Sequence, residues 1–236
     1  MEADSKQKLQ VALVIALIVA GGRTAFILYE RRADAARDKQ PKREVALNRD
    51  YYVTPRKLHP YDLKSARQLT AQPVWVKEGY RYTYYPYNTA TPSVNFAHAA
   101  GTLLPLQKLA ITDVVTASAP QAPADLQVMA VFEQDGKNYA FPIGSRQNGS
   151  FQIYSDEILF VEDPRQLYKH WPAEVWEAIE QHVVKPGMNE LQADFAIGMG
   201  MPEGSGLGAV RIVKYPNGGK PTTITYRNGR ATEIQQ

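Results

Sequence analysis

A stretch of 21 consecutive residues near the start of the chain constrains its architecture most strongly. Residues 9–29 are almost entirely apolar, and Arg23 is the single charged residue among them. As an α-helix rising about 1.5 Å per residue, this stretch would be roughly 31 Å long, which matches the hydrocarbon core of a bilayer. The sequence therefore predicts a transmembrane helix over residues 9–29, preceded by a short tail of residues 1–8.

Two other interpretations of the apolar stretch stay open on the sequence alone. A cleaved signal peptide would use Lys6 and Lys8 as its basic start and the small residues 19–22 as its cleavage region, although apolar residues resume at 25–29. A buried hydrophobic helix is the third interpretation. In a membrane helix, the stem of Arg23 would reach the lipid headgroups, or its charge would contact a partner helix inside the membrane.

The charges on either side of the stretch bear on orientation. Two basic residues precede it and six follow it, so the positive-inside rule places the body of the chain on the cytoplasmic side of a bacterial inner membrane. The six would alternatively contact anionic lipid headgroups, but nearby acidic residues nearly balance their charge. They are Arg31, Arg32, Arg37, Lys39, Lys42 and Arg43.

Composition excludes several classes of function. The net charge of +3 is too small to indicate a nucleic-acid surface. The chain has no cysteine, which excludes disulfides, thiolate metal sites, a cysteine nucleophile and lipid attachment through cysteine. The four histidines stand outside the spacings of known metal motifs, so we expect neither a metal nor a cofactor. They are His59, His98, His170 and His182.

Hydrophobic patterns and turn signals divide the rest of the chain into three parts. Residues 30–60 are predicted to be a juxtamembrane helix and linker. Residues 61–162 contain short strands separated by turn signals, among them Asp135-Gly136, and this pattern is typical of a small antiparallel β-barrel. The block resembles a bacterial SH3-like barrel. Residues 163–236 combine helices with antiparallel strands, so the overall class is predicted to be α+β.

The C-terminal part carries the most specific local signals. Asn189 can cap a helix that ends at Gly198, and Pro172 is expected to separate two earlier helices. The last two strands are joined by Asn228-Gly229, a favoured hairpin turn.

Residues 174–234 resemble the SmpA/OmlA (BamE-like) family of small envelope lipoproteins. The likeness lies in Gly187-Met188-Asn189, in the turn Gly200-Met201-Pro202 and in the closing hairpin. It implies two helices on an antiparallel sheet, acting as a protein-interaction module of the bacterial envelope. It also implies a periplasmic body, in conflict with the positive-inside count. The chain departs from the family in lacking the lipid-bearing cysteine and in having a large preceding domain, so membership in the barrel-assembly machine is not implied.

No set of acid, base and nucleophile stands out, so the chain is predicted not to be an enzyme. The glycine-rich residues 204–208 precede a strand pattern, whereas a phosphate-binding loop precedes a helix. Two pairs of adjacent carboxylates, Asp156-Glu157 and Glu162-Asp163, are more typical of caps and turns than of paired catalytic acids.

Five tyrosines form the strongest candidate contact surface: Tyr80, Tyr82, Tyr84, Tyr85 and Tyr87. The first three would share one face of a strand. They would either pack in the barrel core or offer a stacking surface for a glycan or peptide.

The sequence thus favours a single-pass, membrane-anchored, non-catalytic scaffold or interaction subunit of a bacterial envelope or membrane complex, in contact with lipid and protein partners. The alternative is an envelope ligand-binding domain that uses the tyrosine surface.

Overall fold

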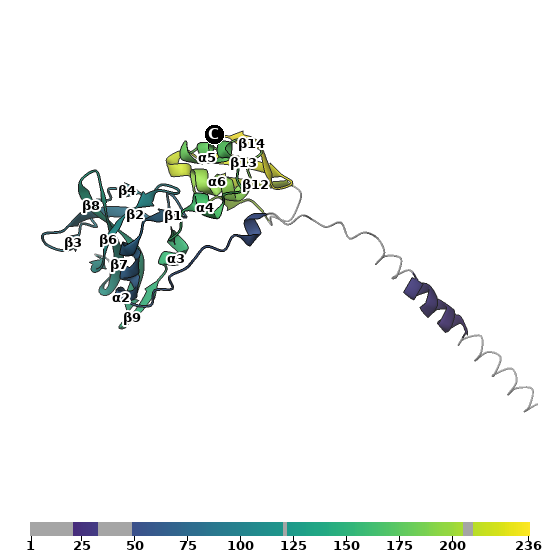
Figure 1. Cartoon of the computed structure of the whole chain (residues 1–236), viewed down its shortest axis with the longest axis horizontal. Helices are drawn as coiled ribbons and strands as arrows, with labels where there is room; N and C mark the ends of the chain where they lie inside the picture. Colours follow the sequence, from purple (N-terminus) through teal and green to yellow (C-terminus); the bar gives the residue numbers. More distant parts are fainter. Residues whose placement is uncertain (1–20, 33–48, 120–121, 205–209) are drawn as a thin grey trace, which may run out of the picture. The chain divides into compact units, whose positions relative to one another are not determined.

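The computed structural model describes residues 21–32, 49–119, 122–204 and 210–236 (Figure 1). The chain divides into two compact units, residues 1–48 and residues 49–236. In the first unit, residues 21–32 form a helix whose side chains are all exposed. The sheets and the buried side chains of the described residues belong to the second unit.

The transmembrane helix predicted over residues 9–29 is contradicted by the structure. No helix among the described residues is both long enough and apolar enough to cross a membrane. The described helical stretch, residues 21–32, accounts for about 18 Å. This stretch contains exposed Arg23 within the predicted span and Glu30, Arg31 and Arg32 directly after it, and charges are costly in hydrocarbon. Residues 1–20 lie outside the described part.

The second unit begins with an extended segment, residues 49–60, which we call the strap. It starts as the 3₁₀ turn η1, runs on without regular structure and leads into two short helices. Asp62 and Ser65 form a capping box at the start of the first of these, with the Ser65 N–H donating to the Asp62 carboxylate at 2.7 Å. The elements are η1 (Arg49–Tyr52), α2 (Leu63–Ala66) and η2 (Arg67–Ala71).

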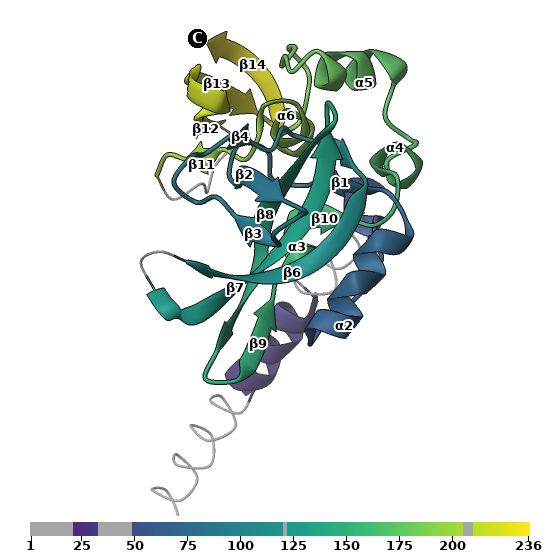
Figure 2. The same cartoon turned by 90° about the vertical axis from the view of Figure 1, so that its left-hand side faces the viewer.

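An antiparallel sheet dominates the next part of the unit (Figure 2). Its strand order is β3-β2-β8-β7-β6, with β4 also paired to β2 and β9 to β8. The predicted Asp135-Gly136 turn is confirmed, because both residues have positive φ, at 52° and 70°, and join β7 to β8. The strands are β2 (Thr83–Asn88), β3 (Ser93–Val94), β4 (Gly101–Thr102), β6 (Ile111–Ala119), β7 (Ala122–Gln134), β8 (Lys137–Gln147) and β9 (Ser150–Ile153).

A smaller three-stranded sheet, in the order β10-β1-β5, lies where two hydrophobic cores meet. Alternate residues of a strand face opposite sides. Val74 and Val76 therefore enter the first core, beside Phe132 and Phe141, while Trp75 between them packs on the second. The elements are β1 (Val74–Val76), β5 (Lys108–Leu109), α3 (Ser155–Ile158) and β10 (Leu159–Phe160).

The C-terminal part packs helices against a four-stranded antiparallel sheet in the order β11-β12-β13-β14. The predicted cap is confirmed, because the Asn189 side chain accepts the N–H of Gln192 at 2.8 Å. Pro172 precedes α5, and Asn228-Gly229 closes the last hairpin, as expected. The elements are α4 (Pro164–Leu167), α5 (Ala173–Glu180), α6 (Glu190–Ile197), β11 (Met201–Pro202), β12 (Val210–Tyr215), η3 (Asn217–Gly219), β13 (Thr222–Arg227) and β14 (Arg230–Gln235).

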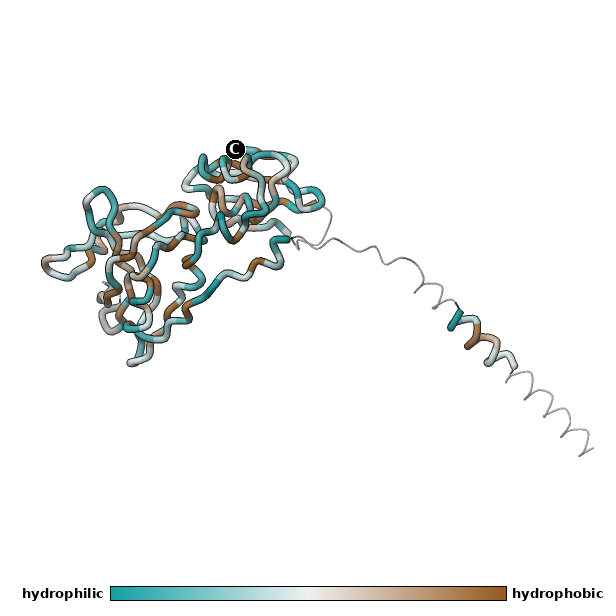
Figure 3. Tube along the Cα trace, viewed as in Figure 1, coloured by the Kyte–Doolittle hydropathy of each residue, from teal (hydrophilic) through white to brown (hydrophobic). Residues whose placement is uncertain are grey.

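The class is therefore mixed α and β with antiparallel sheets, as predicted, but without the predicted membrane span in the part of the chain that is described. Figure 3 shows apolar segments running through both parts of the second unit. The two cores place α4 and α5 beside β1 and β5, and a groove opens between them.

Candidate binding site

A groove of about 380 Å³ lies between the loop leading into β5 and the helices α4 and α5. Its floor is largely apolar, whereas its rim is charged, which is the usual construction of a ligand pocket. The residues that define it are Trp75, Leu106, Lys108, Arg165, Trp176 and His182. We call it the tryptophan groove.

The two tryptophans come from distant parts of the chain. Trp75 is the central residue of β1, and Trp176 lies on α5. A cation lies over each indole ring: the Lys108 ammonium is 5.5 Å from the centre of Trp75, and the Arg165 guanidinium is 5.6 Å from that of Trp176. These cation–π contacts hold the charged heads at the groove wall beside the aromatic faces.

Two residues of the groove have left-handed backbones that bulky side chains rarely adopt. Leu106 has φ of 50° and His182 has φ of 54°. Hydrogen bonds fix both positions: the Leu106 N–H donates to Val76 O at 3.0 Å, and the His182 N–H donates to Ile179 O at 3.0 Å. Strained backbones held in this way gather at functional sites.

The charged and polar side chains of the groove differ in their ion-pair and hydrogen-bond partners. Arg165 pairs with Glu180, and the Asp163 carboxylate accepts the backbone N–H of Arg165 at 2.9 Å. His182 donates from Nδ1 to the carbonyl of Ala196 at 3.0 Å. Lys108 is exposed and has no ion pair among the described residues, and the Asp163 carboxylate, which also lines the groove, likewise has none there.

A buried polar cluster lies under α6. The Asp194 carboxylate accepts the Gly200 N–H at 3.4 Å, and the hydroxyls of Tyr215 and Tyr226 are 2.8 Å apart. Burial raises the pKa of Asp194 to about 7, with a further upward contribution from the charge of Glu190. Burial also raises the pKa of both tyrosine hydroxyls, so they are neutral at physiological pH.

The five candidate tyrosines occupy three different environments. Tyr82 and Tyr84 pack on the first core, and Tyr84 contacts the ring of Phe132 at a centroid distance of 5.5 Å. Tyr85 and Tyr87 pack on the opposite face of the sheet. Tyr80 precedes β2 and has φ of 62°, so it does not share the strand face that the alternating pattern predicted. Whether these tyrosines bind a ligand stays a prediction.

Tyr80 instead lines a second hollow, of about 370 Å³, together with Arg81, Met199 and Met201. Its ring packs against Gly218, where a Cβ would lie 2.8 Å from the ring. Met199 and Met201 are exposed, and Arg81 Nη1 lies 3.6 Å from the Met199 sulfur. The hollow is open and apolar, with its one arginine paired to Glu78 at 3.0 Å.

The adjacent carboxylates identified in the sequence serve the strap and a helix cap. Asp156 accepts two backbone N–H groups of the strap, at 3.0 and 2.7 Å, and Glu162 accepts a third at 2.7 Å. Glu157 pairs with Lys57 at 2.9 Å, and Asp163 caps α4. Their hydrogen-bonding capacity is thus directed to the chain's own backbone and side chains.

The described residues include no group of three or more His, Asp or Glu side chains arranged to hold a metal ion. Most of the glycine-rich residues 204–208 lie outside the described part. Comparison of the chain with protein families, curated proteins and solved structures finds no match. The resemblances to SmpA/OmlA modules and to SH3-like barrels therefore stay predictions.

Sequence reasoning missed the tryptophan groove. It identified a strand at Val74–Val76 and a helix containing Trp176, but no local pattern indicates that residues about 100 positions apart face one another. The available signal was that large aromatic residues stand near basic ones in the sequence. That pattern alone is a weak indication of a binding groove.

Proposed function

We propose that this chain is a non-catalytic interaction protein that binds a partner polypeptide in the tryptophan groove. The observation that carries the proposal is the groove itself, which is lined by two tryptophans and by an exposed lysine that lies over one of them and has no ion pair among the described residues. A few anchor residues, tryptophan prominent among them, carry most of the binding energy of protein interfaces. The resemblance of residues 174–234 to envelope interaction modules points in the same direction.

The chemistry of the groove specifies the partner segment. Leu104 is 40% exposed and, with Trp75, gives an apolar surface for one side chain of the partner. Lys108 lies over Trp75, so a carboxylate next to that apolar side chain would meet the ammonium group. We therefore expect an extended segment with an apolar residue adjacent to an aspartate or glutamate.

Peptides selected from a displayed random library against the full chain test this expectation. We expect enrichment of sequences in which an apolar residue neighbours an acidic one. Lys108→Glu should weaken their binding at least about tenfold, because it replaces attraction with repulsion at the rim. Fluorescence anisotropy of labelled synthetic peptides gives the dissociation constants.

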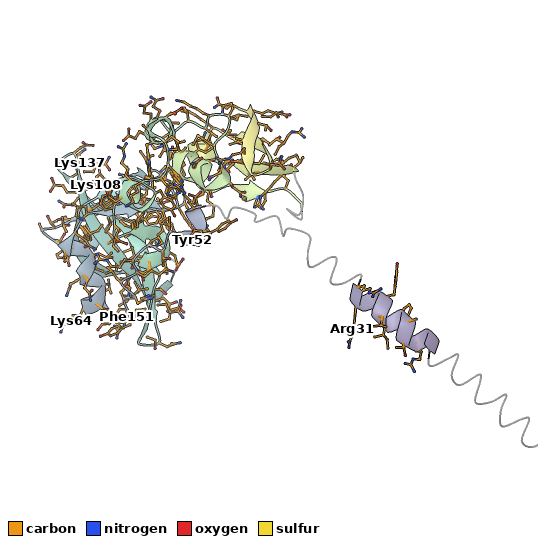
Figure 4. The ribbon with its side chains drawn as sticks, turned by 45° about the vertical axis from the view of Figure 1, so that its right-hand side comes forward. Arg31, Tyr52, Lys64, Lys108, Lys137 and Phe151 are labelled. Carbon is orange, nitrogen blue, oxygen red and sulfur yellow. The ribbon has the colours of Figure 1, made fainter. Side chains whose placement is uncertain are left out.

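Two further variants make the test specific. Leu104→Ser should also weaken binding, because it removes apolar contact surface at an exposed position where folding changes little. Lys64→Glu is the matched control, because Lys64 is also an exposed lysine and lies on α2. Figure 4 shows Lys64 and Lys108 well separated on the second unit. Selected peptides that bind Lys108→Glu and Leu104→Ser as tightly as the unaltered chain would contradict the proposal.

A further inference from the structure

One aspartate of the strap lies in a site built from three converging donors. The Asp50 carboxylate accepts hydrogen bonds from His170 Nε2 at 2.6 Å, Trp171 Nε1 at 2.7 Å and Asn189 Nδ2 at 2.8 Å. The side chain of Asp50 is only 8% exposed. Hydrogen bonds to a buried carboxylate are stronger than those between neutral groups, so this contact is specific for a negative charge.

The donors are held in place by the C-terminal part rather than by the strap. Trp171 is buried and stacks on Tyr168 at a centroid distance of 4.5 Å. Asn189 is fixed by its capping box at the start of α6. In this box the side-chain oxygen of Asn189 is the acceptor, so its side-chain nitrogen is available to donate. Trp171 and Asn189 are therefore positioned by contacts within the C-terminal part.

The strap, by contrast, is attached largely through polar groups. Apart from the side chain of Asp50, the side chains of η1 are exposed, and Tyr51 and Tyr52 are 81% and 68% exposed. Val53 and Leu58 are only partly buried and pack on different cores, and Pro60 at the end of the strap is its one buried residue. Backbone N–H groups of the strap donate to the two carboxylates described above. Segments with few buried apolar contacts open at low free-energy cost.

We propose that the site formed by His170, Trp171 and Asn189 is a recognition site for an Asp-x-x-Val segment, and that the strap is its reversible intramolecular ligand. Asp50 is bound by the three donors, and Val53 packs on the core that contains Trp171. The two residues belong to one turn, which the Val53 N–H closes by donating to Asp50 O at 3.3 Å. The two tyrosines between them point to solvent and can vary. A partner polypeptide with the same spacing competes with the strap for the site. The proposal does not depend on the tryptophan groove.

The test uses the full chain carrying Asp50→Ala and a labelled peptide of residues 49–57. Removing the carboxylate weakens the docking of the strap, so the peptide should bind this variant at least about tenfold more tightly than it binds the unaltered chain, where the strap competes at a high effective concentration. Peptides with Asp50→Ala or Val53→Ser should bind at least about tenfold more weakly. Fluorescence anisotropy measures all of these affinities.

A site variant separates recognition from folding. Asn189→Asp keeps the oxygen that caps α6 but replaces the donor with a carboxylate that repels Asp50. In the Asp50→Ala background it should abolish peptide binding while the circular dichroism spectrum stays unchanged. Equal peptide affinity for the unaltered chain and the Asp50→Ala variant, or no binding to either, would overturn the proposal.

Hydrogen exchange on the unaltered chain gives a second measurement that needs no variant. The N–H groups of Arg56, Leu58 and His59 should exchange at least about a hundredfold faster than those of the β7–β8 pair, because the strap opens without global unfolding. Exchange of these three groups as slow as that of β7 and β8 would show that the strap is part of the cooperative core and would refute a reversible ligand.

Discussion

Replacement of Phe195 with alanine is expected to lower the free energy of unfolding by about 3–5 kcal/mol, the largest single effect on this fold. Phe195 is 3% exposed on α6, and its ring lies 5.7 Å from that of Phe160, 5.2 Å from Tyr168 and 5.3 Å from Trp171. These partners come from β10, the end of α4 and the connection to α5. A cavity at this point would remove contacts from three elements at once.

Denaturant titration of the two proteins, followed by circular dichroism, measures this loss. Tyr61→Ala is the matched control, since Tyr61 is 76% exposed and its removal should change stability by less than about 0.5 kcal/mol. Because Trp171 also contacts Trp176 at 5.3 Å, the variant should disturb the floor of the tryptophan groove as well. A loss no larger than that of Tyr61→Ala would show that the second core is not organised around Phe195.

Replacement of Asp194 with asparagine is expected to change how stability depends on pH. Burial raises the pKa of Asp194 from 3.8 to about 7, so the folded chain binds a proton that the unfolded chain releases between these values. The stabilisation due to this proton is complete below pH 3.8 and is lost as the pH rises to about 7. Over that interval the loss amounts to about 4 kcal/mol.

The side-chain amide introduced by Asp194→Asn would stay neutral at every pH and would still accept the Gly200 N–H, so this loss should disappear. We subtract the unfolding free energy of the variant from that of the unaltered chain. This difference should fall by about 1.4 kcal/mol per pH unit between about pH 4 and 7 and should then stay constant. Urea titrations at several pH values measure it. Asp135→Asn, in the exposed β7–β8 turn, is the control. A difference that stays constant with pH would contradict the role given to burial.

Both substitutions lie on α6, one in its apolar contacts and the other in its polar contacts. Phe195 and Asp194 are neighbours on α6, yet one packs among aromatic rings and the other contacts the segment at Gly200. That segment leads to the exposed Met199 and Met201 of the second hollow. Changes in α6 should therefore be transmitted to both hollows of the unit.

The prediction of a membrane helix shows where sequence reasoning went furthest from the structure. Length and hydropathy over residues 9–29 matched a bilayer, but no helix among the described residues is long and apolar enough to cross a membrane. The described stretch of residues 21–32 contains Arg23, Glu30, Arg31 and Arg32, and four charges within twelve residues are costly in hydrocarbon.

The expectation that Tyr80 shares a strand face with Tyr82 and Tyr84 was wrong for a related reason. Alternation from Tyr80 to Tyr84 is sufficient to place side chains on one face only if all of them lie in the strand. The left-handed backbone of Tyr80 breaks the alternation before β2 begins at Thr83. Contacts of its ring with Gly198 and Gly218, far along the chain, accompany that conformation.

The sequence by itself determined the local features: the cap at Asn189, the helix start after Pro172 and the tight turns at Asp135-Gly136 and Asn228-Gly229. These depend on the φ and ψ preferences of a few adjacent residues and on hydrogen bonds within one turn. Only the tertiary structure brought Trp75 to Trp176, and Asp50 to His170, Trp171 and Asn189. Those contacts join residues about 100 or more positions apart, and the packing of the whole second unit, rather than any local preference, decides which of them meet.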